Sequence, residues 1–199
     1  MKVRIKEEGK TREFNLINKW SDVNLKSWTK LITKQNEKKG KQAKSIIAEL
    51  SNIPEALIDK IELTDIALIM SKIGSMQQKK NSTLKRLIKI EGKEYGFHPD
   101  LESITLGEYA DIETFVSQGT EKHLPEIMAI LYRPVVEKQD NLYKIEAYDG
   151  DIKLRASQMN KMSAEQVQSA LVFFYHFVKM FLTTMPSVLI DRLKETKQQ

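Results

Sequence analysis

Cysteine is absent from all 199 positions of this chain. Its absence excludes disulfides and thiolate metal sites, and small secreted domains usually depend on such cross-links. We therefore expect a cytosolic protein that folds on its hydrophobic core alone. With 41% hydrophobic and 30% charged residues, the composition provides for that core and for a heavily solvated surface.

Long hydrophobic runs are also missing. The most apolar stretch, Ala170–Leu182, contains His176 and Lys179 and is shorter than the roughly 20 residues that span a bilayer. The N-terminal stretch Met1–Lys6 alternates charged and apolar side chains, which a signal peptide does not do. We expect neither a membrane-spanning segment nor a cleaved leader.

The sequence has few patterns that carry chemistry. Its eight glycines occur singly, so no glycine-rich phosphate loop is present. His98, His123 and His176 are far apart and form no ligand motif, and we expect His176 at the core or its boundary. Asp149 and Asp151 flank Gly150; a turn is favoured over a weak cation site because other calcium ligands are missing. We predict no catalytic residues, no cofactor and no metal, and so no enzyme.

Charge is modest overall but uneven. The formal net charge is +5, yet residues 26–44 hold seven lysines and one acid. Such clusters indicate either a solvated surface or contact with nucleic acid or an acidic partner. A solvated surface is favoured, because aromatic residues, apart from Trp28, are not interleaved and lysine outnumbers arginine. The alternative function is a basic nucleic-acid-binding module using segments 26–44 and 79–93. Its candidate contacts are Lys38, Lys39, Lys41, Lys44, Lys79, Lys80, Lys85 and Arg86.

The first part of the chain reads as a hairpin followed by helices. Apolar residues alternate over 3–5 and 13–16 around a turn at 8–10, which is typical of two strands. Helical spacing then predicts a helix capped by Ser21 or Asp22, a second over about 43–50, and a third after Pro54. A fourth helix is expected from Thr64 to Gly74.

The pattern then restarts. Residues 88–97 match residues 5–14 at six of ten positions, and both segments carry a turn glycine. The offset changes from 83 to 81, where Ile46–Leu50 falls on Ile127–Leu131. Self-similarity at a fixed spacing indicates a duplicated unit. We therefore predict two domains, 1–80 and 81–199, whose helices share one core because a half of this size is only marginally able to bury its own.

The second unit is longer. Residues 132–134 are expected to close a helix, and residues 142–148, between polar turns, predict an inserted hairpin. Ser163 can cap a long amphipathic helix that Pro186 ends, with its main face made by Val167, Leu171, Phe174, Tyr175, Val178 and Leu182. The predicted fold class is helix-rich α+β, with two tandem hairpin–helix units.

Two features indicate protein binding. Aromatic residues at helical spacing are usually core, but Phe173 and Phe177 lie off the main apolar face of their helix. Small sheets also leave strand edges that can accept another strand. The candidate protein-interaction residues are Trp28, Tyr109, Phe173, Phe177 and Phe181.

Residues 2–74 also resemble a known family. Val23-Asn24-Leu25 enters a helix, Ile46–Glu55 reads IIAELSNIPE, and Ile61–Ile66 reads IELTDI. These segments are similar to the tail assembly chaperones of contractile-tailed bacteriophages, and the second unit, with Ser103–Tyr109, looks like a divergent copy. The chain also resembles small virion and baseplate proteins of tailed phages. It departs from the chaperones in its double length, its inserted hairpin and Asn52 in place of a common glycine.

The resemblance implies a non-enzymatic role in virion morphogenesis. Such chaperones keep the hydrophobic tape-measure protein soluble until the tail polymerises. The implied partners are tape-measure, tail or baseplate subunits, with homo-oligomerisation a further option and nucleic acid or membrane not expected. The implied location is the host cytoplasm, or the virion if the protein is a structural subunit.

Overall fold

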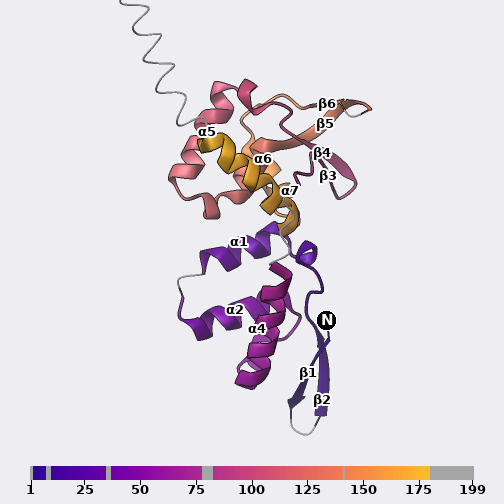
Figure 1. Cartoon of the computed structure of the whole chain (residues 1–199), viewed down its shortest axis with the longest axis vertical. Helices are drawn as coiled ribbons and strands as arrows, with labels where there is room; N and C mark the ends of the chain where they lie inside the picture. The colour runs from indigo at the N-terminus through magenta and orange to yellow at the C-terminus, as the bar shows by residue number, and fades with distance from the viewer. Residues whose placement is uncertain (1, 8–9, 35–36, 78–82, 141, 180–199) are drawn as a thin grey trace, which may run out of the picture.

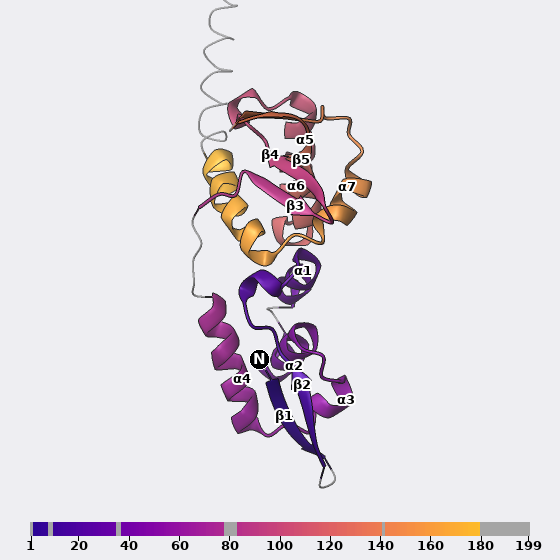
Figure 2. The same ribbon diagram turned by 90° about the vertical axis from the view of Figure 1, so that its right-hand side faces the viewer.

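The computed structural model describes residues 2–7, 10–34, 37–77, 83–140 and 142–179. Over these residues the chain is α+β, with two antiparallel sheets and helices packed on them (Figure 1). The molecule is elongated, with the N-terminal elements in one half and the C-terminal elements in the other (Figures 1 and 2). The predicted α+β class is confirmed. The predicted domain boundary near residue 80 lies outside the described residues.

The N-terminal half places a two-stranded sheet beside a group of helices. Val3 pairs with Phe14 and Ile5 with Arg12 across the hairpin, while the expected turn at 8–9 lies outside the described residues. The elements are β1 (Lys2–Glu7), β2 (Lys10–Asn15), the short 3-10 helix η1 (Trp20–Asp22), α1 (Leu25–Thr33), α2 (Lys39–Leu50), α3 (Glu55–Ile58) and α4 (Leu63–Gln77).

Three predicted helix ends in this half are wrong. The cap of α1 is Asn24, whose side chain accepts a hydrogen bond from the Ser27 amide at 2.8 Å, whereas Asp22 accepts from backbone amides at the start of η1. The second helix starts at Lys39 rather than near residue 43. Helix α4 continues through Gly74 to Gln77, because an isolated glycine lowers helix stability without ending the helix.

The C-terminal half is built on a four-stranded sheet of order β3-β4-β5-β6. Its β3–β4 turn has Glu91 and Gly92 at positive φ, 49° and 83°, as a two-residue hairpin turn requires. Its elements are β3 (Leu87–Ile90), β4 (Lys93–Phe97), η2 (Leu101–Ser103), α5 (Leu106–Ser117), η3 (Thr120–Lys122), α6 (Leu124–Leu131), β5 (Tyr132–Gln139), β6 (Leu142–Ile145) and α7 (Ile152–Met159). A final helix covers residues 164–179 as far as the structure describes them.

The hairpin predicted around residues 139–141 is present as β5 and β6, but its limits differ from the prediction. Helix α6 ends at Leu131 with Tyr132 as its C-cap, as predicted, but residues 132–134 also start β5, and β6 stops at Ile145. Proline is rare in a central strand, so the sequence did not predict a strand at Pro134. Its position is tolerated next to a register irregularity between Val135 and Glu137. Helix α7 was not expected, because its sequence carries a weak apolar pattern.

Helix α1 joins the two halves and lies between them in both views (Figures 1 and 2). The Leu25 amide donates to the Met162 carbonyl at 2.7 Å, and the Ala164 amide donates to the Val23 carbonyl at 2.7 Å. The Trp20 indole N–H donates to the Gln168 side chain at 3.0 Å. The buried apolar residues of both halves form one contiguous core, as predicted. None of the described helices is both long enough and apolar enough to cross a bilayer.

Candidate protein-docking site

The residues predicted to bind other proteins differ in their exposure to solvent: some lie in the core and others at the surface. Trp28 is buried in α1, so its contacts lie within the chain. Phe177 is also buried, at 3% exposure, whereas Phe173 is 40% exposed and Tyr109 is half-buried. Phe181 lies outside the described residues. Tyr109 and Phe177, which are distant in sequence, line the same surface groove.

The helix over residues 164–179 starts where the sequence predicts. The Gln166 amide donates to the Ser163 hydroxyl at 3.2 Å, and the Ser163 amide donates to the Gln166 side chain at 3.0 Å. This reciprocal pair satisfies two backbone N–H groups at the helix start. The side chains that the helix buries are Ala164, Val167, Ala170, Phe174 and Phe177.

This buried stripe corrects the predicted face. Tyr175 was assigned to the apolar face but is 50% exposed, and Phe177 was assigned away from it but is buried. The i, i+3, i+4, i+7 rule admits two neighbouring stripes in a helix that is apolar on several sides. Packing against α5 selects the stripe that contains Phe177. His176, expected at the core or its boundary, is exposed.

Helix α5 forms the other wall of the groove. Its first turn is fixed by a capping box in which Thr105 and Glu108 exchange hydrogen bonds. Ile112 is 3% exposed on its inner side. On its outer side the Tyr109 hydroxyl donates to the Glu113 carboxylate at 3.2 Å, which holds the ring at the edge of the groove.

The groove between the two helices has an almost entirely apolar lining and a cavity of about 160 Å³. Among the described lining residues, the polar side-chain groups are those of Tyr109, Glu113 and Ser117, which come from the α5 wall. The apolar lining residues are Ile112, Val116, Phe177 and Val178. Glu113 is the one carboxylate among these lining residues, and the Tyr109 hydroxyl donates to it at the edge of the groove. Such a surface can bury the apolar side chains of another helix.

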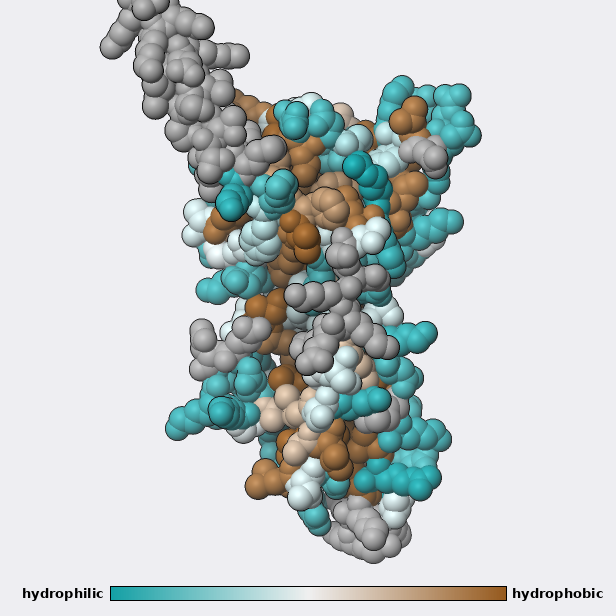
Figure 3. All heavy atoms as spheres, in the orientation of Figure 1, coloured by the Kyte–Doolittle hydropathy of each residue, from teal (hydrophilic) through white to brown (hydrophobic). Residues whose placement is uncertain are grey.

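A second groove runs between β1 and α4, in the other half of the molecule. Figure 3 shows apolar surface among the hydrophilic residues of this half. Leu63 and Leu68 of α4 are 82% and 69% exposed. The groove itself is lined by charged as well as apolar side chains. The charged ones are Lys2, Arg4, Lys60, Glu62, Asp65 and Lys72. These charges keep it hydrated, so it is a weaker candidate for apolar docking than the α5 groove.

The lysine clusters do not form one surface. Lys38, Lys39 and Lys41 are exposed around the start of α2, in the N-terminal half. Lys44 pairs with Asp59 at 2.7 Å. Lys85 and Arg86 precede β3 in the other half, where the Arg86 guanidinium donates to the Pro99 carbonyl at 3.3 Å. Lys79 and Lys80 lie outside the described residues.

A buried charged cluster went unnoticed in the sequence. Glu108 of α5 lies 2.6 Å from the Arg133 guanidinium and 3.6 Å from the His98 ring, and these side chains are 1%, 6% and 9% exposed. Burial lowers the pKa of His98 despite the neighbouring carboxylate. Burial alone would raise the pKa of Glu108, but hydrogen bonds from Thr105 and the charge of Arg133 lower it overall. No short-range pattern connects positions 98, 108 and 133.

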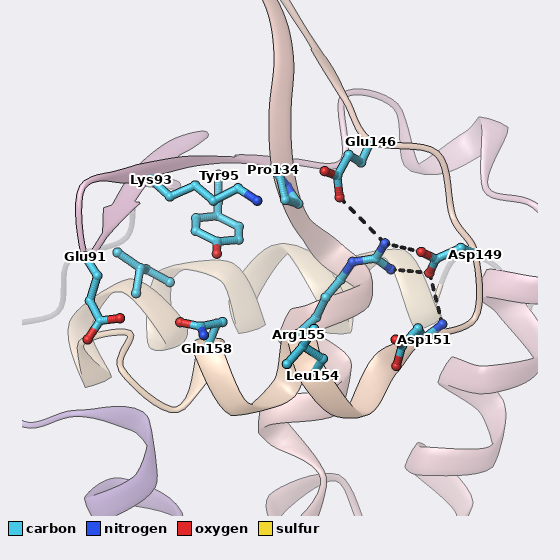
Figure 4. Close-up of a pocket in the computed structure, with 11 residues that line it drawn as sticks. Glu91, Lys93, Tyr95, Pro134, Glu146, Asp149, Asp151, Leu154, Arg155 and Gln158 are labelled. Carbon is cyan, nitrogen blue, oxygen red and sulfur yellow. Dashed lines mark hydrogen bonds and ion pairs between the residues drawn. The ribbon is translucent and has the colours of Figure 1, made fainter.

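The remaining cavity of note lies between the sheet and α7, with a volume of about 490 Å³ (Figure 4). On its rim the Arg155 guanidinium makes two hydrogen bonds of 2.7 Å to Asp149, which lowers the pKa of that carboxyl. The Asp151 amide also donates to Asp149, and Gly150 has a φ of 78°, so the predicted turn is confirmed. Among the described residues, no three acidic or histidine side chains are grouped to hold a metal ion.

Comparison of the chain with known protein families, with curated proteins and with solved structures finds no match.

Proposed function

We propose that this protein is a non-enzymatic docking protein whose groove between α5 and residues 164–179 holds an apolar helix of a partner protein. One observation carries the proposal: Ile112, Val116, Phe177 and Val178 give the groove an almost fully apolar lining. A partner helix would bury apolar residues at i, i+3 and i+4 against that lining. Glu113, at the α5 edge, favours a helix with a basic residue beside its apolar stripe.

We place this docking role in the assembly of a tailed-phage virion, as a tail assembly chaperone or a structural subunit. The resemblance of segments 46–55 and 61–66 to the chaperones supports it. The partner is then a tape-measure, tail or baseplate subunit, as the resemblance implies. The protein would act in the host cytoplasm and, as a structural subunit, remain in the particle.

A closed charged cluster supports a non-enzymatic role. His98, Glu108 and Arg133 are the most concentrated titratable groups in the described core, and all three are shielded from solvent. Glu108 also caps α5 through Thr105. A substrate has no access to these groups, so we assign them to stability rather than to catalysis.

We also propose that the two halves are copies of one hairpin–helix unit. Ile5 pairs with Arg12, and Ile88 pairs with Tyr95, which lie 83 residues later. The Ile17 amide donates to the Leu50 carbonyl, and the His98 amide donates to the Leu131 carbonyl, 81 residues later. Both offsets equal those of the sequence match. Superposition of the two halves in an experimental structure should align hairpin and helices in the same order, and a different helix path would contradict the proposal.

Quantitative mass spectrometry of purified particles and of infected-cell lysate tests the phage assignment. A fixed copy number per particle would identify a structural subunit. Abundance in the lysate, in complex with a structural protein but absent from particles, would identify a chaperone. Absence from particles together with no associated structural protein would overturn the proposal.

The nucleic-acid alternative has its own test. Binding through the lysine clusters predicts a DNA affinity that falls steeply with salt, by roughly one decade per decade of salt for each phosphate contact. Replacing Lys38, Lys39 and Lys41 by glutamine would reduce that slope. Since these lysines lie in a different half from Lys85 and Arg86, we expect no steep salt dependence and no effect of the substitutions.

A further inference from the structure

We propose that the cavity between β4 and α7 binds a primary alkylammonium group, as carried by a lysine side chain or a polyamine. The site is separate from the docking groove and does not depend on it. Its walls come from the β3–β4 turn, β5, the segment 146–151 and α7 (Figure 4). The volume of about 490 Å³ accommodates an extended alkyl chain with its charged end.

The first observation is a hydroxyl without a partner on a largely buried side chain. Tyr95 is 4% exposed, and its ring points from β4 toward α7, with the Gln158 amide on the opposite wall (Figure 4). Within the described part of the chain, the Tyr95 hydroxyl makes no hydrogen bond. The hydroxyl opens on the cavity, where it can take a hydrogen-bond partner from outside the chain. A ligand donor in the cavity would supply that partner.

The second observation is the excess of negative charge around this hydroxyl. Four carboxylates line the cavity, against two cations, Lys93 and Arg155. Arg155 forms an ion pair with Asp149, and its guanidinium is 3.7 Å from the Glu146 carboxylate. The carboxylates are Glu91, Glu146, Asp149 and Asp151.

These charges are only partly neutralised. Glu91 is paired with Lys161 at 2.5 Å, whereas Asp151 forms no ion pair within the described residues. Burial and the charges of Glu146 and Glu91 raise the pKa of Tyr95, in keeping with a negative potential at the hydroxyl. A cation entering the cavity would therefore be stabilised by Glu146 and Asp151.

The chemistry of the lining matches an ammonium on an alkyl stem. An ammonium has three N–H donors and no acceptor. The cavity offers three kinds of acceptor, which are the Tyr95 hydroxyl oxygen, the Gln158 amide oxygen and the Glu146 carboxylate. Ile90, Pro134 and Leu154 supply apolar wall for the stem.

The chain's own Lys93 is at the same cavity. Its ammonium lies 5.9 Å from the centre of the Tyr95 ring, so an alkylammonium is already accommodated beside this ring. Lys93 would compete with a cationic ligand. It would instead assist an anionic one, because the other lining cation, Arg155, is already engaged by Asp149. Substituting Lys93 therefore has opposite consequences for the two charge types.

Calorimetric titration of the full chain tests the proposal with two probes, spermidine and the peptide acetyl-Ala-Ala-Lys-Ala-Ala-amide. We expect one saturable site that Tyr95→Phe and Asp151→Asn each weaken by about tenfold, the scale of one lost polar contact. Lys93→Gln should tighten binding severalfold. Glu137→Gln, at the exposed end of β5 and outside the cavity, is the matched control and should change nothing.

The two probes distinguish the source of the ligand. Binding of the peptide alone would identify a lysine of a partner protein, and binding of spermidine alone would identify a free polyamine; either result supports the site. Failure of both probes to bind at millimolar concentration would overturn it. So would an unchanged affinity in Tyr95→Phe, or loss of binding in Lys93→Gln.

Discussion

At the scale of single residues, Glu108, Arg133 and His98 form a buried charged cluster in the otherwise apolar core of the C-terminal half. Glu108 is 1% exposed and connects the start of α5 to β5 through Arg133. A buried ion pair adds little stability compared with an apolar pair, but removing one partner leaves an uncompensated charge. The cluster therefore makes the fold sensitive to conservative substitutions.

Glu108→Gln should lower the free energy of unfolding by about 3 kcal/mol, because it leaves the Arg133 guanidinium buried without a counter-charge. Urea unfolding followed by circular dichroism measures the change. The matched control is Glu137→Gln in the Lys144 pair, where both side chains are mostly exposed. We expect about 0.5 kcal/mol or less there. Equal losses in the two variants would show that the cluster is not electrostatically coupled.

His98 predicts how stability depends on pH. Burial lowers its pKa in the folded state, so the unfolded chain binds more protons as the pH falls below the usual histidine value of about 6.5. Stability from this group is thus complete above that value and is lost toward acid, by at most about 1.4 kcal/mol per pH unit. Unfolding between pH 7.5 and 5.5 should show this slope. His98→Gln should flatten it, whereas exposed His176→Gln should leave it unchanged.

At the scale of elements, two glycines have opposite roles. A Cβ on Gly96 of β4 would lie 2.5 Å from the Tyr143 ring and 2.8 Å from Ile145, both on β6. A Cβ on Gly40 of α2 would meet nothing within 4 Å. Gly96 lets β6 side chains pack directly on the β4 backbone, and the Tyr143 hydroxyl then reaches the Phe97 carbonyl at 2.7 Å. Gly40 has no such role.

Gly96→Ala should therefore destabilise the protein by about 1–3 kcal/mol through overpacking. Gly40→Ala should stabilise it by about 0.5 kcal/mol, since alanine restricts the unfolded chain and favours the helix. Thermal unfolding of the two variants measures both effects. A stabilised Gly96→Ala, or two shifts of the same sign, would contradict the packing of β6 on β4.

The elements that the sequence predicts best are those with strong local patterns. The two hairpins follow from apolar alternation and turn glycines, and the helix after Ser163 follows from its capping box. Helix α7 and the start of β5 were missed because their stability comes from tertiary contacts, with α7 packed closely on α6. Gly74 was read as a helix stop, but α4 continues to Gln77, whereas α6 does end before Pro134, which lies in β5.

Some residues of the docking groove could be predicted from the sequence, but the groove itself could not. Tyr109 and Phe177 were both selected as aromatic residues at helical spacing, yet nothing local indicates that α5 and the last helix meet. Trp28 has the same local pattern and is buried at the joint between the halves. Pairing of distant helices and strands also created the Tyr95 cavity and the His98 cluster.

At the scale of the whole molecule, α1 makes the two halves one folding unit. Leu25 is fully buried, and its amide bonds to Met162 of the other half. Leu25→Ala should cost about 3 kcal/mol as a large-to-small core substitution. Unfolding should remain a single transition in both wild type and variant, measured by calorimetry. Two separate transitions would show that the halves unfold independently.

The central claim is that the groove between α5 and residues 164–179 holds a helix of a virion protein. A photo-reactive benzoylphenylalanine at exposed Ser117, which lines the groove, tests it in infected cells, with the same group at exposed Leu142 on β6 as control. The account predicts a cross-link from position 117, but not from 142, to an apolar helical segment of a particle protein. No cross-link to such a protein, the same product from both positions, or a cross-link to this chain's own residues 180–199 would contradict it.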